Sequence, residues 1–127
     1  MSENVETWKA RLTGTPSLML GWSTAEGKGN ELSYLLLPVE FIAPRGRSVP
    51  GVLSIFATDV LDAADAGLIA DGPGPGKTAT IATTRAQFSD LVGFVQAGRV
   101  GDFQLHAQNP RGRERQLVSW SVAIALR

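Results

Sequence analysis

Large apolar and small residues alternate along the last part of the chain, from Arg115 to Leu126. Alternation with a period of two is typical of a strand that buries one face. One face carries Val118, Trp120, Val122, Ile124 and Leu126, and the other carries Ser119, Ser121, Ala123 and Ala125. The short side chains of the second face allow close approach. We predict that either the helix of this chain or another subunit covers it.

A second segment, residues 102–108, alternates in the same way, and residues 109–114 between the two are rich in turn formers. One register places Phe103 opposite Trp120 and Leu105 opposite Val118. That register puts all the large apolar residues on one face, as a half-buried hairpin requires. We therefore predict a hairpin in which Trp120 is buried against Phe103.

Further strands are predicted upstream, over Ser17–Ser23, Glu31–Ala43 and Val52–Ala57. Pro38 has no N–H to donate to a neighbouring strand, so the second of these is expected to be an edge strand or to be bulged there. Glu6–Leu12 fits either a strand or a helix. We favour a strand that pairs with Ser17–Ser23 across a turn at Gly14-Thr15-Pro16.

One helix is predicted over Arg85–Ala97, because Phe88, Leu91, Val92 and Val95 repeat with helical spacing. Thr84 and Gln87 have the spacing of a capping box, and Gly98 is placed to end the helix. A weaker helix is indicated over Asp59–Ala66. We expect one domain over residues 1–127, of the α+β class, with an antiparallel sheet of about six or seven strands and one or two short helices. An all-β roll or barrel is the alternative.

Composition narrows the possible functions. The 127 residues include no cysteine, which excludes disulfides, thiolate nucleophiles and cysteine-ligated metals. The 12 basic and 12 acidic residues give a net charge of zero, whereas nucleic-acid binders usually carry a basic excess. We see no signal peptide, and the densest apolar stretch, Tyr34–Ile42, is too short to cross a bilayer. We expect a cytoplasmic protein that binds neither membrane nor nucleic acid.

The segment Gly76-Lys77-Thr78 matches the end of the phosphate-binding P-loop pattern. The pattern's first glycine is replaced by Asp71, whose charge would oppose a phosphate. A P-loop threonine also opens a helix, but the residues after Thr78 are β-branched and strand-like. We interpret the segment as a connector, in which replacing Lys77 by alanine leaves folding unchanged.

Two Arg-Gly-Arg turns are candidate anion sites, because glycine lets a ligand approach the backbone and guanidinium groups bind phosphate or carboxylate in a fork. They contribute Arg45 and Arg47 in one turn, and Arg111 and Arg113, with Arg115 beside them, in the other. Two ordinary solvated turns are the alternative interpretation.

His106, the single histidine, is the remaining candidate ligand-binding residue. A histidine can act as a general base for a nearby serine if an acid orients its ring. In the predicted register Ser119 lies opposite Gln104 rather than His106, so we assign no catalytic residue. The carboxylates do not cluster with metal-ligand spacing, and we expect no metal and no cofactor.

Together these features favour a small cytoplasmic binding or adaptor domain without catalytic activity, which forms a homo-oligomer, with a dimer as the favoured state. A phosphate-ligand domain that uses the Arg-Gly-Arg turns to bind a nucleotide or nucleic acid is the first alternative. A structural assembly subunit is the second.

Overall fold

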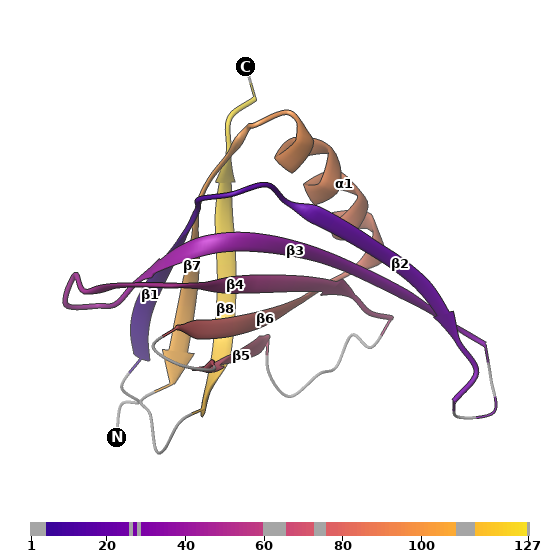
Figure 1. The fold of residues 1–127 in the computed structure, drawn as a ribbon, viewed down its shortest axis with the longest axis horizontal. Coiled ribbons are helices and arrows are strands. Elements are labelled where there is room, and N and C mark those ends of the chain that lie inside the picture. The colour runs from indigo at the N-terminus through magenta and orange to yellow at the C-terminus, as the bar shows by residue number, and fades with distance from the viewer. Residues whose placement is uncertain are drawn as a thin grey trace.

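The computed structural model describes residues 5–25, 27, 29–59, 66–72, 76–108 and 114–126. Within them the chain forms eight strands and one helix (Figure 1). These are β1 (Val5–Leu12), β2 (Ser17–Ser23), β3 (Asn30–Ile42), β4 (Ser48–Ala57), β5 (Gly67–Asp71), β6 (Lys77–Thr83), α1 (Arg85–Gln96), β7 (Val100–Gln108) and β8 (Glu114–Ile124). The helix predicted over Asp59–Ala66 falls largely outside the described residues.

Seven of the strands close into a barrel in the order β1-β7-β8-β5-β6-β4-β3, with β3 pairing back to β1. Every pair is antiparallel except β4 with β6, which is parallel, so the sheet is mixed. The all-β barrel alternative therefore describes the fold better than the α+β class with an antiparallel sheet that we favoured. The physical reason is that one short helix cannot cover an open sheet, and closure buries the apolar face without helices.

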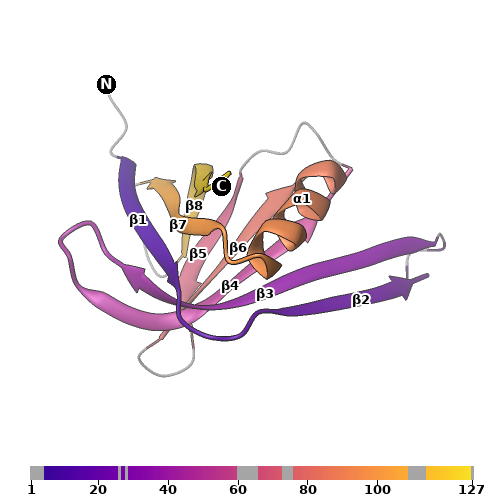
Figure 2. The ribbon, with the colours of Figure 1, turned by 90° about the horizontal axis from the view of Figure 1, so that it is seen from above.

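The interior of the barrel is filled by the inward-facing residues of its strands. In β3 these are Leu35, Leu37, Val39 and Phe41, all almost fully buried. From α1, Phe88, Leu91 and Val95 join the same apolar cluster. Seen from above in Figure 2, α1 lies over one end of the barrel.

The helix begins and ends as the sequence predicts. The Thr84 hydroxyl accepts a hydrogen bond from the backbone N–H of Gln87 at 3.1 Å, and the Gln87 side chain accepts one from the backbone N–H of Thr84. Beyond the last turn, the N–H of Gly98 bonds the carbonyl of Val95, and the residue has a φ of 70°. The positive φ there requires glycine.

One edge of β3 pairs with two successive strands. Its first half pairs with β2, and its last four residues, from Val39 to Ile42, pair with β1. The predicted hairpin between Glu6–Leu12 and Ser17–Ser23 is therefore wrong, although both segments are strands. The expectation that Pro38 lies in an edge or bulged strand is also wrong. β3 has neighbours on both sides, and Pro38 falls at the gap between β2 and β1, where no N–H is needed.

The β7–β8 hairpin is present, but its register differs by two residues from the prediction. Trp120 lies opposite Leu105, and Phe103 lies opposite Val122. A β-bulge at Val118 shifts the pairing, because Ser119 pairs with His106 while Leu117 pairs with Ala107. The bulge turns Leu117 into the core and leaves Val118 exposed, contrary to the predicted faces.

Trp120 is half-buried rather than buried, although it does contact Phe103. The two ring centroids are 6.4 Å apart, and the indole N–H of Trp120 donates to the carbonyl of Ala82 at 3.0 Å. The predicted contact between Trp120 and Phe103 is therefore confirmed, but between diagonal neighbours of the hairpin rather than directly opposite residues. The indole N–H of Trp120 is hydrogen-bonded near the end of β6.

We expect Gly51→Ala to lower the free energy of unfolding by about 1–3 kcal/mol, because the new methyl group has no space. Gly51 pairs with Lys77 where β4 and β6 run parallel, and a Cβ there would lie 2.5 Å from Cε2 of the fully buried Phe41 and against the Lys77 carbonyl. Gly93 in α1 is the control, since its Cβ would meet open space. Gly93→Ala should stabilise by about 0.5–1 kcal/mol.

Urea unfolding followed by circular dichroism measures both changes in the free energy of unfolding. A free energy of unfolding that Gly51→Ala leaves unchanged or raises would contradict the tight β4–β6 closure.

Candidate functional site

The structure describes both arginines of the first Arg-Gly-Arg turn and, beside the second turn, only Arg115. Arg45 and Arg47 are exposed in the turn between β3 and β4, where the N–H of Ala43 bonds the Arg47 carbonyl at 2.8 Å. Arg111 and Arg113 lie outside the described residues. Arg115 is half-buried, and its Nη1 lies 3.5 Å from Oε1 of Glu6. Of the predicted arginines, Arg115 is thus already engaged by the barrel.

His106 lies on the outer face of the barrel, half-buried between β1 and β8. Its Nδ1 is 3.0 Å from the hydroxyl of Thr7, the residue opposite it on β1. On its other side it pairs with Ser119, so the prediction that Ser119 faces Gln104 is wrong. In a catalytic His–Ser pair, an acid binds one imidazole nitrogen and so orients the ring. In this protein Nδ1 of His106 is hydrogen-bonded to the Thr7 hydroxyl.

Lys77 opens β6 and belongs to a cluster around Trp8 at the end of the barrel. Its Nζ lies 5.3 Å from the centroid of the Trp8 ring and forms an ion pair with Asp71. The guanidinium of Arg115 lies 5.1 Å from the same centroid. Trp8 is 5% exposed, and cations near the face of a buried indole stabilise it. As predicted, the segment before Lys77 connects two elements, the strands β5 and β6. The contacts of Lys77 with Trp8 and Asp71 give a reason to expect that its removal lowers stability, in place of the unchanged folding expected from the sequence. The strand that follows Lys77 is as predicted.

β2 and the first half of β3 form a two-stranded extension of the sheet, which we call the ribbon. It extends away from the barrel (Figure 2), and β2 has a strand neighbour on one side only. Leu18, Met19, Leu20 and Trp22 of β2 are exposed by 46%, 55%, 69% and 65%. With about 150–250 Å² for a large aromatic side chain, and somewhat less for the aliphatic ones, these four expose roughly 400–500 Å². Leu18, Leu20 and Trp22 share one face of β2 and account for roughly 300–400 Å² of this area, which is in the range of the largest apolar patches of monomeric proteins, and such patches are often functional.

The exposure of β2 could not be predicted while Ser17–Ser23 was expected to pair with Glu6–Leu12, whereas it pairs with β3 at the end of the sheet. A signal was present, since the segment Ser17–Ser23 contains no charged residue. Edge strands are usually protected by charged side chains, prolines or bulges, and β2 has none of these. An uncharged edge with apolar residues on both faces indicates an interaction surface.

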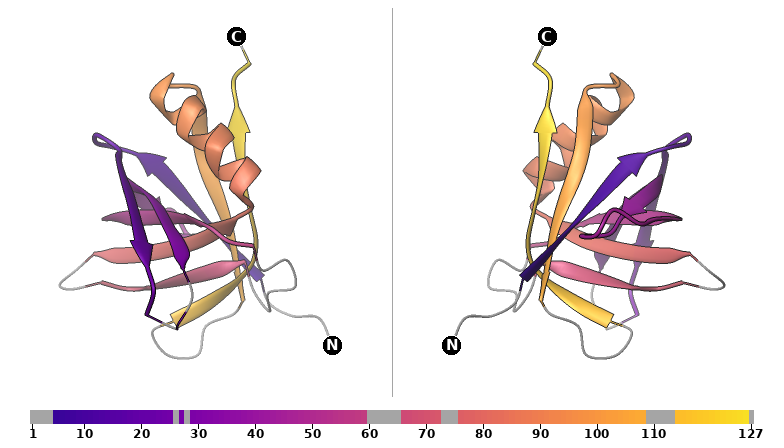
Figure 3. Two further views of the ribbon diagram at one scale, coloured as in Figure 1. Left: turned by 90° about the vertical axis from the view of Figure 1, so that its right-hand side faces the viewer. Right: turned by 90° about the vertical axis from the view of Figure 1, so that its left-hand side faces the viewer.

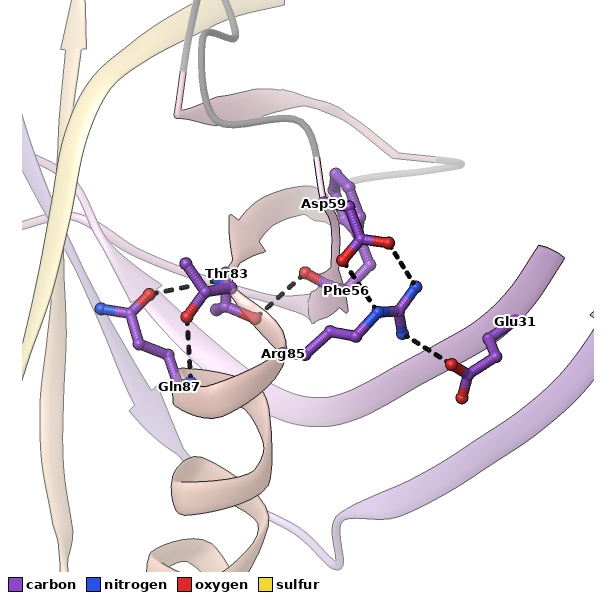
Figure 4. Close-up of polar contacts among 7 residues, drawn as sticks. Glu31, Phe56, Asp59, Thr83, Arg85 and Gln87 are labelled. Carbon is purple, nitrogen blue, oxygen red and sulfur yellow. Dashed lines mark hydrogen bonds and ion pairs between the residues drawn. The ribbon is translucent and has the colours of Figure 1, made fainter.

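The ribbon is held in a defined position. Trp22 lies so close to Gly29 that a side chain at Gly29 would overlap its indole ring. Glu31, which pairs with Trp22 across the ribbon, lies 3.6 Å from Nη1 of Arg85 at the start of α1. Figure 4 shows Arg85 between Glu31 and Asp59, whose carboxylate accepts two hydrogen bonds from the guanidinium at 3.0 and 3.3 Å. Arg85 thus links the ribbon to the barrel.

The hydrogen bonds that Arg85 donates to Asp59, followed by the attraction of the Asp59 and Glu31 carboxylates, raise the pKa of Arg85 above its ordinary value against the opposing effect of desolvation. The guanidinium therefore stays charged at every pH at which the protein is folded, and the link does not depend on titration of Arg85.

A groove lies between α1 and β8, which we call the β8 groove. Its volume is about 630 Å³. Its lining residues are Gln87, Asp90, Leu91 and Phe94 from α1, residues 118–122 and Ile124 from β8, and Ala66. Figure 3 shows α1 beside this upper part of β8. Ser119 and Ser121 of the predicted interface line the groove, whereas Ala123 and Ala125 are exposed outside it.

The β8 groove runs along an open strand edge. β5 pairs with β8 only as far as Leu117, and no described strand continues that side of β8 over residues 118–124. The lining includes both the inward Trp120 and Val122 and the outward Ser119 and Ser121. Because consecutive strand residues point to opposite faces, a hollow lined by both sets follows the edge itself.

Phe94 forms part of the helical wall of this groove. It is half-buried, yet it is not one of the apolar side chains that pack on the barrel core. An aromatic side chain that lines a groove without supporting the core is typical of a binding anchor.

Across the described residues, no three histidine or carboxylate side chains come together in a way that could hold a metal ion. Nor is any described helix long and apolar enough to cross a lipid bilayer.

We expect Lys77→Ala to lower the free energy of unfolding by about 1–2 kcal/mol, because it removes the cation from the Trp8 ring and leaves Asp71 without this ion pair. Lys9→Ala is the control, since Lys9 is an exposed lysine of β1 next to Trp8 in sequence and should change stability little. Urea unfolding followed by tryptophan fluorescence compares the two. Equal free energies of unfolding for both variants would show that the contacts of Lys77 with Trp8 and Asp71 do not stabilise the protein.

We expect Arg85→Ala to loosen the ribbon while leaving the barrel folded, because its contacts with Glu31 and Asp59 lie at the surface. Amide hydrogen exchange should become faster in β2 and the first half of β3 and stay unchanged in β7. Arg99→Ala is the control, since Arg99 is an exposed arginine that bonds the Leu126 carbonyl instead. Unchanged exchange in β2 would show that Arg85 does not position the ribbon.

No protein-family model, no curated protein sequence and no solved structure matches this chain. What the protein does is therefore inferred from the β8 groove and the ribbon.

Proposed function

We propose that the protein is a binding module without catalytic activity, which takes up an extended peptide strand in the β8 groove. The observation that supports this most directly is the open edge of β8 over residues 118–124, which lies inside a groove of about 630 Å³ beside α1. A groove with an open strand edge along one wall fits a strand better than it fits a compact ligand.

Backbone hydrogen bonds would supply much of the affinity. The unpaired N–H and C=O groups along β8 can bond an added strand, as in other domains that bind peptides by extending a sheet. These groups do not depend on the peptide's sequence, so they favour any extended segment. Selectivity then has to come from the side chains of the groove.

The walls of the groove favour alternating apolar residues. Leu91 and Phe94 of α1 face the space that an added strand would occupy, with Trp120 on the β8 side. Because alternate residues of a strand share a face, residues at every second position of the peptide would contact this apolar wall. Residues between them would lie with Ser119 and Ser121 on the outer face.

A phosphate-ligand function draws less support from the structure. Arg115 contacts Trp8 and Glu6, and Arg45 and Arg47 lie exposed in a turn. A structural assembly function agrees with the proposal, because subunits of assemblies often join by adding strands to one another's sheets.

We expect Phe94→Ala to weaken peptide binding at least about 30-fold, the effect of losing a binding anchor worth about 2 kcal/mol. The probe is a pooled library of ten-residue peptides with alternating apolar and polar positions, and binding is followed by the fluorescence of Trp120, which lines the groove. Stability should fall by at most about 1 kcal/mol, since Phe94 does not pack on the core.

Phe88→Ala is the matched control. Phe88 is a buried phenylalanine of the same helix that belongs to the core, so its loss should cost about 3–5 kcal/mol of stability. If no peptide of the library binds wild-type protein below about 100 µM, which is weaker than most specific complexes, the proposed function is wrong.

A further inference from the structure

We infer that the strand bound in the β8 groove is β2 of a second copy of this chain, so that copies join head to tail. The inference rests on the proposed function of the groove as a strand acceptor. It identifies the partner from two surfaces that the same chain presents, the β8 groove and the ribbon.

The two open edges match in length and character. β2 spans seven residues with a strand neighbour on one side only, and the open edge of β8 over residues 118–124 has the same length. These are the two longest stretches of described strand that lack a neighbour on one side. Each edge supplies the unpaired backbone groups that the other needs.

The side chains of β2 fit the apolar wall of the groove. Leu18, Leu20 and Trp22 share one face of β2, since they pair with Leu35, Ser33 and Glu31 on β3. This single face would lie against Phe94 and Leu91 if β2 entered the groove. Trp22, the largest of the three, lies with its indole ring over Gly29 and remains 65% exposed.

The charges of the two surfaces do not oppose the contact. β2 has no charged residue, and among the lining residues of the groove only Asp90 is charged. The whole chain has a net charge of zero, so copies of it do not repel one another strongly. The contact face of β2, formed by Leu18, Leu20 and Trp22, exposes roughly 300–400 Å² of apolar area, which is a little under half of the about 800 Å² that each partner buries in a standard interface. The backbone edges and the walls of the groove supply the rest.

The position of the two surfaces makes the contact a head-to-tail one. Figure 2 shows α1 between β8 on one side and the ribbon on the other. A copy that places its ribbon in a neighbour's groove still has its own groove on the other side of α1. Two copies that fill each other's grooves form a two-fold dimer, and copies that do not reciprocate form a closed ring or an open fibre.

A mixing experiment tests this arrangement. Leu20→Lys places a charge on the exposed ribbon face, and Phe94→Glu places one in the groove, so each variant loses one half of the contact. At about 100 µM, well above a micromolar dissociation constant, wild-type protein should sediment as species larger than the 13.5 kDa monomer. Each variant alone should sediment as a monomer.

An equal mixture of the two variants should restore one contact, between the intact ribbon of Phe94→Glu and the intact groove of Leu20→Lys. It should yield a species of twice the monomer mass and nothing larger. Met19→Lys is the matched control, because Met19 is an exposed residue of the opposite face of β2 and should associate as wild type does. Circular dichroism confirms that every variant is folded.

Three results would overturn the inference. One is a wild-type monomer at 100 µM, which would leave the proposed function standing if library peptides still bind in a Phe94-dependent way. Another is a Phe94→Glu dimer beside a Leu20→Lys monomer, which would indicate that two β2 strands pair directly. The third is a mixture that stays monomeric although wild-type protein associates.

Discussion

The fold depends on one constraint, which is that a single edge of β3 pairs with two successive strands. The last residues of β3 pair with β1 and close the barrel, and its first half pairs with β2 outside the barrel. The change of partner falls at Pro38, whose carbonyl accepts a hydrogen bond from the N–H of Thr13 in the connection. A proline suits this point because the ladder is interrupted there on the side of β1 and β2. Closure of the core and exposure of the ribbon therefore follow from the same pairing.

The barrel and β2 therefore differ in how far their backbone groups are paired and their apolar side chains are buried. Closure of the barrel pairs most of its strand edges and leaves β8 open over residues 118–124, and its apolar face is covered by its own wall and by α1. β2 is added to that closed structure, so it gains hydrogen bonds on one side and leaves its other edge and its apolar side chains in water. Natural proteins usually protect such an edge. An edge that is unprotected, apolar and held in position is more consistent with a binding role than with an incidental extension.

Elements that are specified by residues close together in the chain could be predicted from the sequence. The helix with its Thr84 cap and the β7–β8 hairpin belong to this group, since spacing and turn residues specify them. The details that depend on distant pairing could not. The bulge at Val118 turns Leu117 rather than Val118 inward and accounts for one of the two residues by which the pairing of Trp120 differs from the prediction. The candidate site was predicted only in part, through Ser119 and Ser121, because the groove exists only when α1 packs beside the unpaired half of β8.

Helix α1 joins the two proposed contact surfaces, and this has a consequence for assembly. Arg85 at its first turn contacts Glu31 of the ribbon, and Phe94 near its last turn lines the groove. Between them Phe88 and Leu91 anchor the helix in the core, so the helix cannot shift without opening the barrel. The angle between ribbon and groove is therefore set by one rigid element. A fixed angle gives every head-to-tail contact the same rotation, which is what closure into a ring of defined size requires. Loss of the Arg85 link would relax that angle and favour open or irregular chains over a ring.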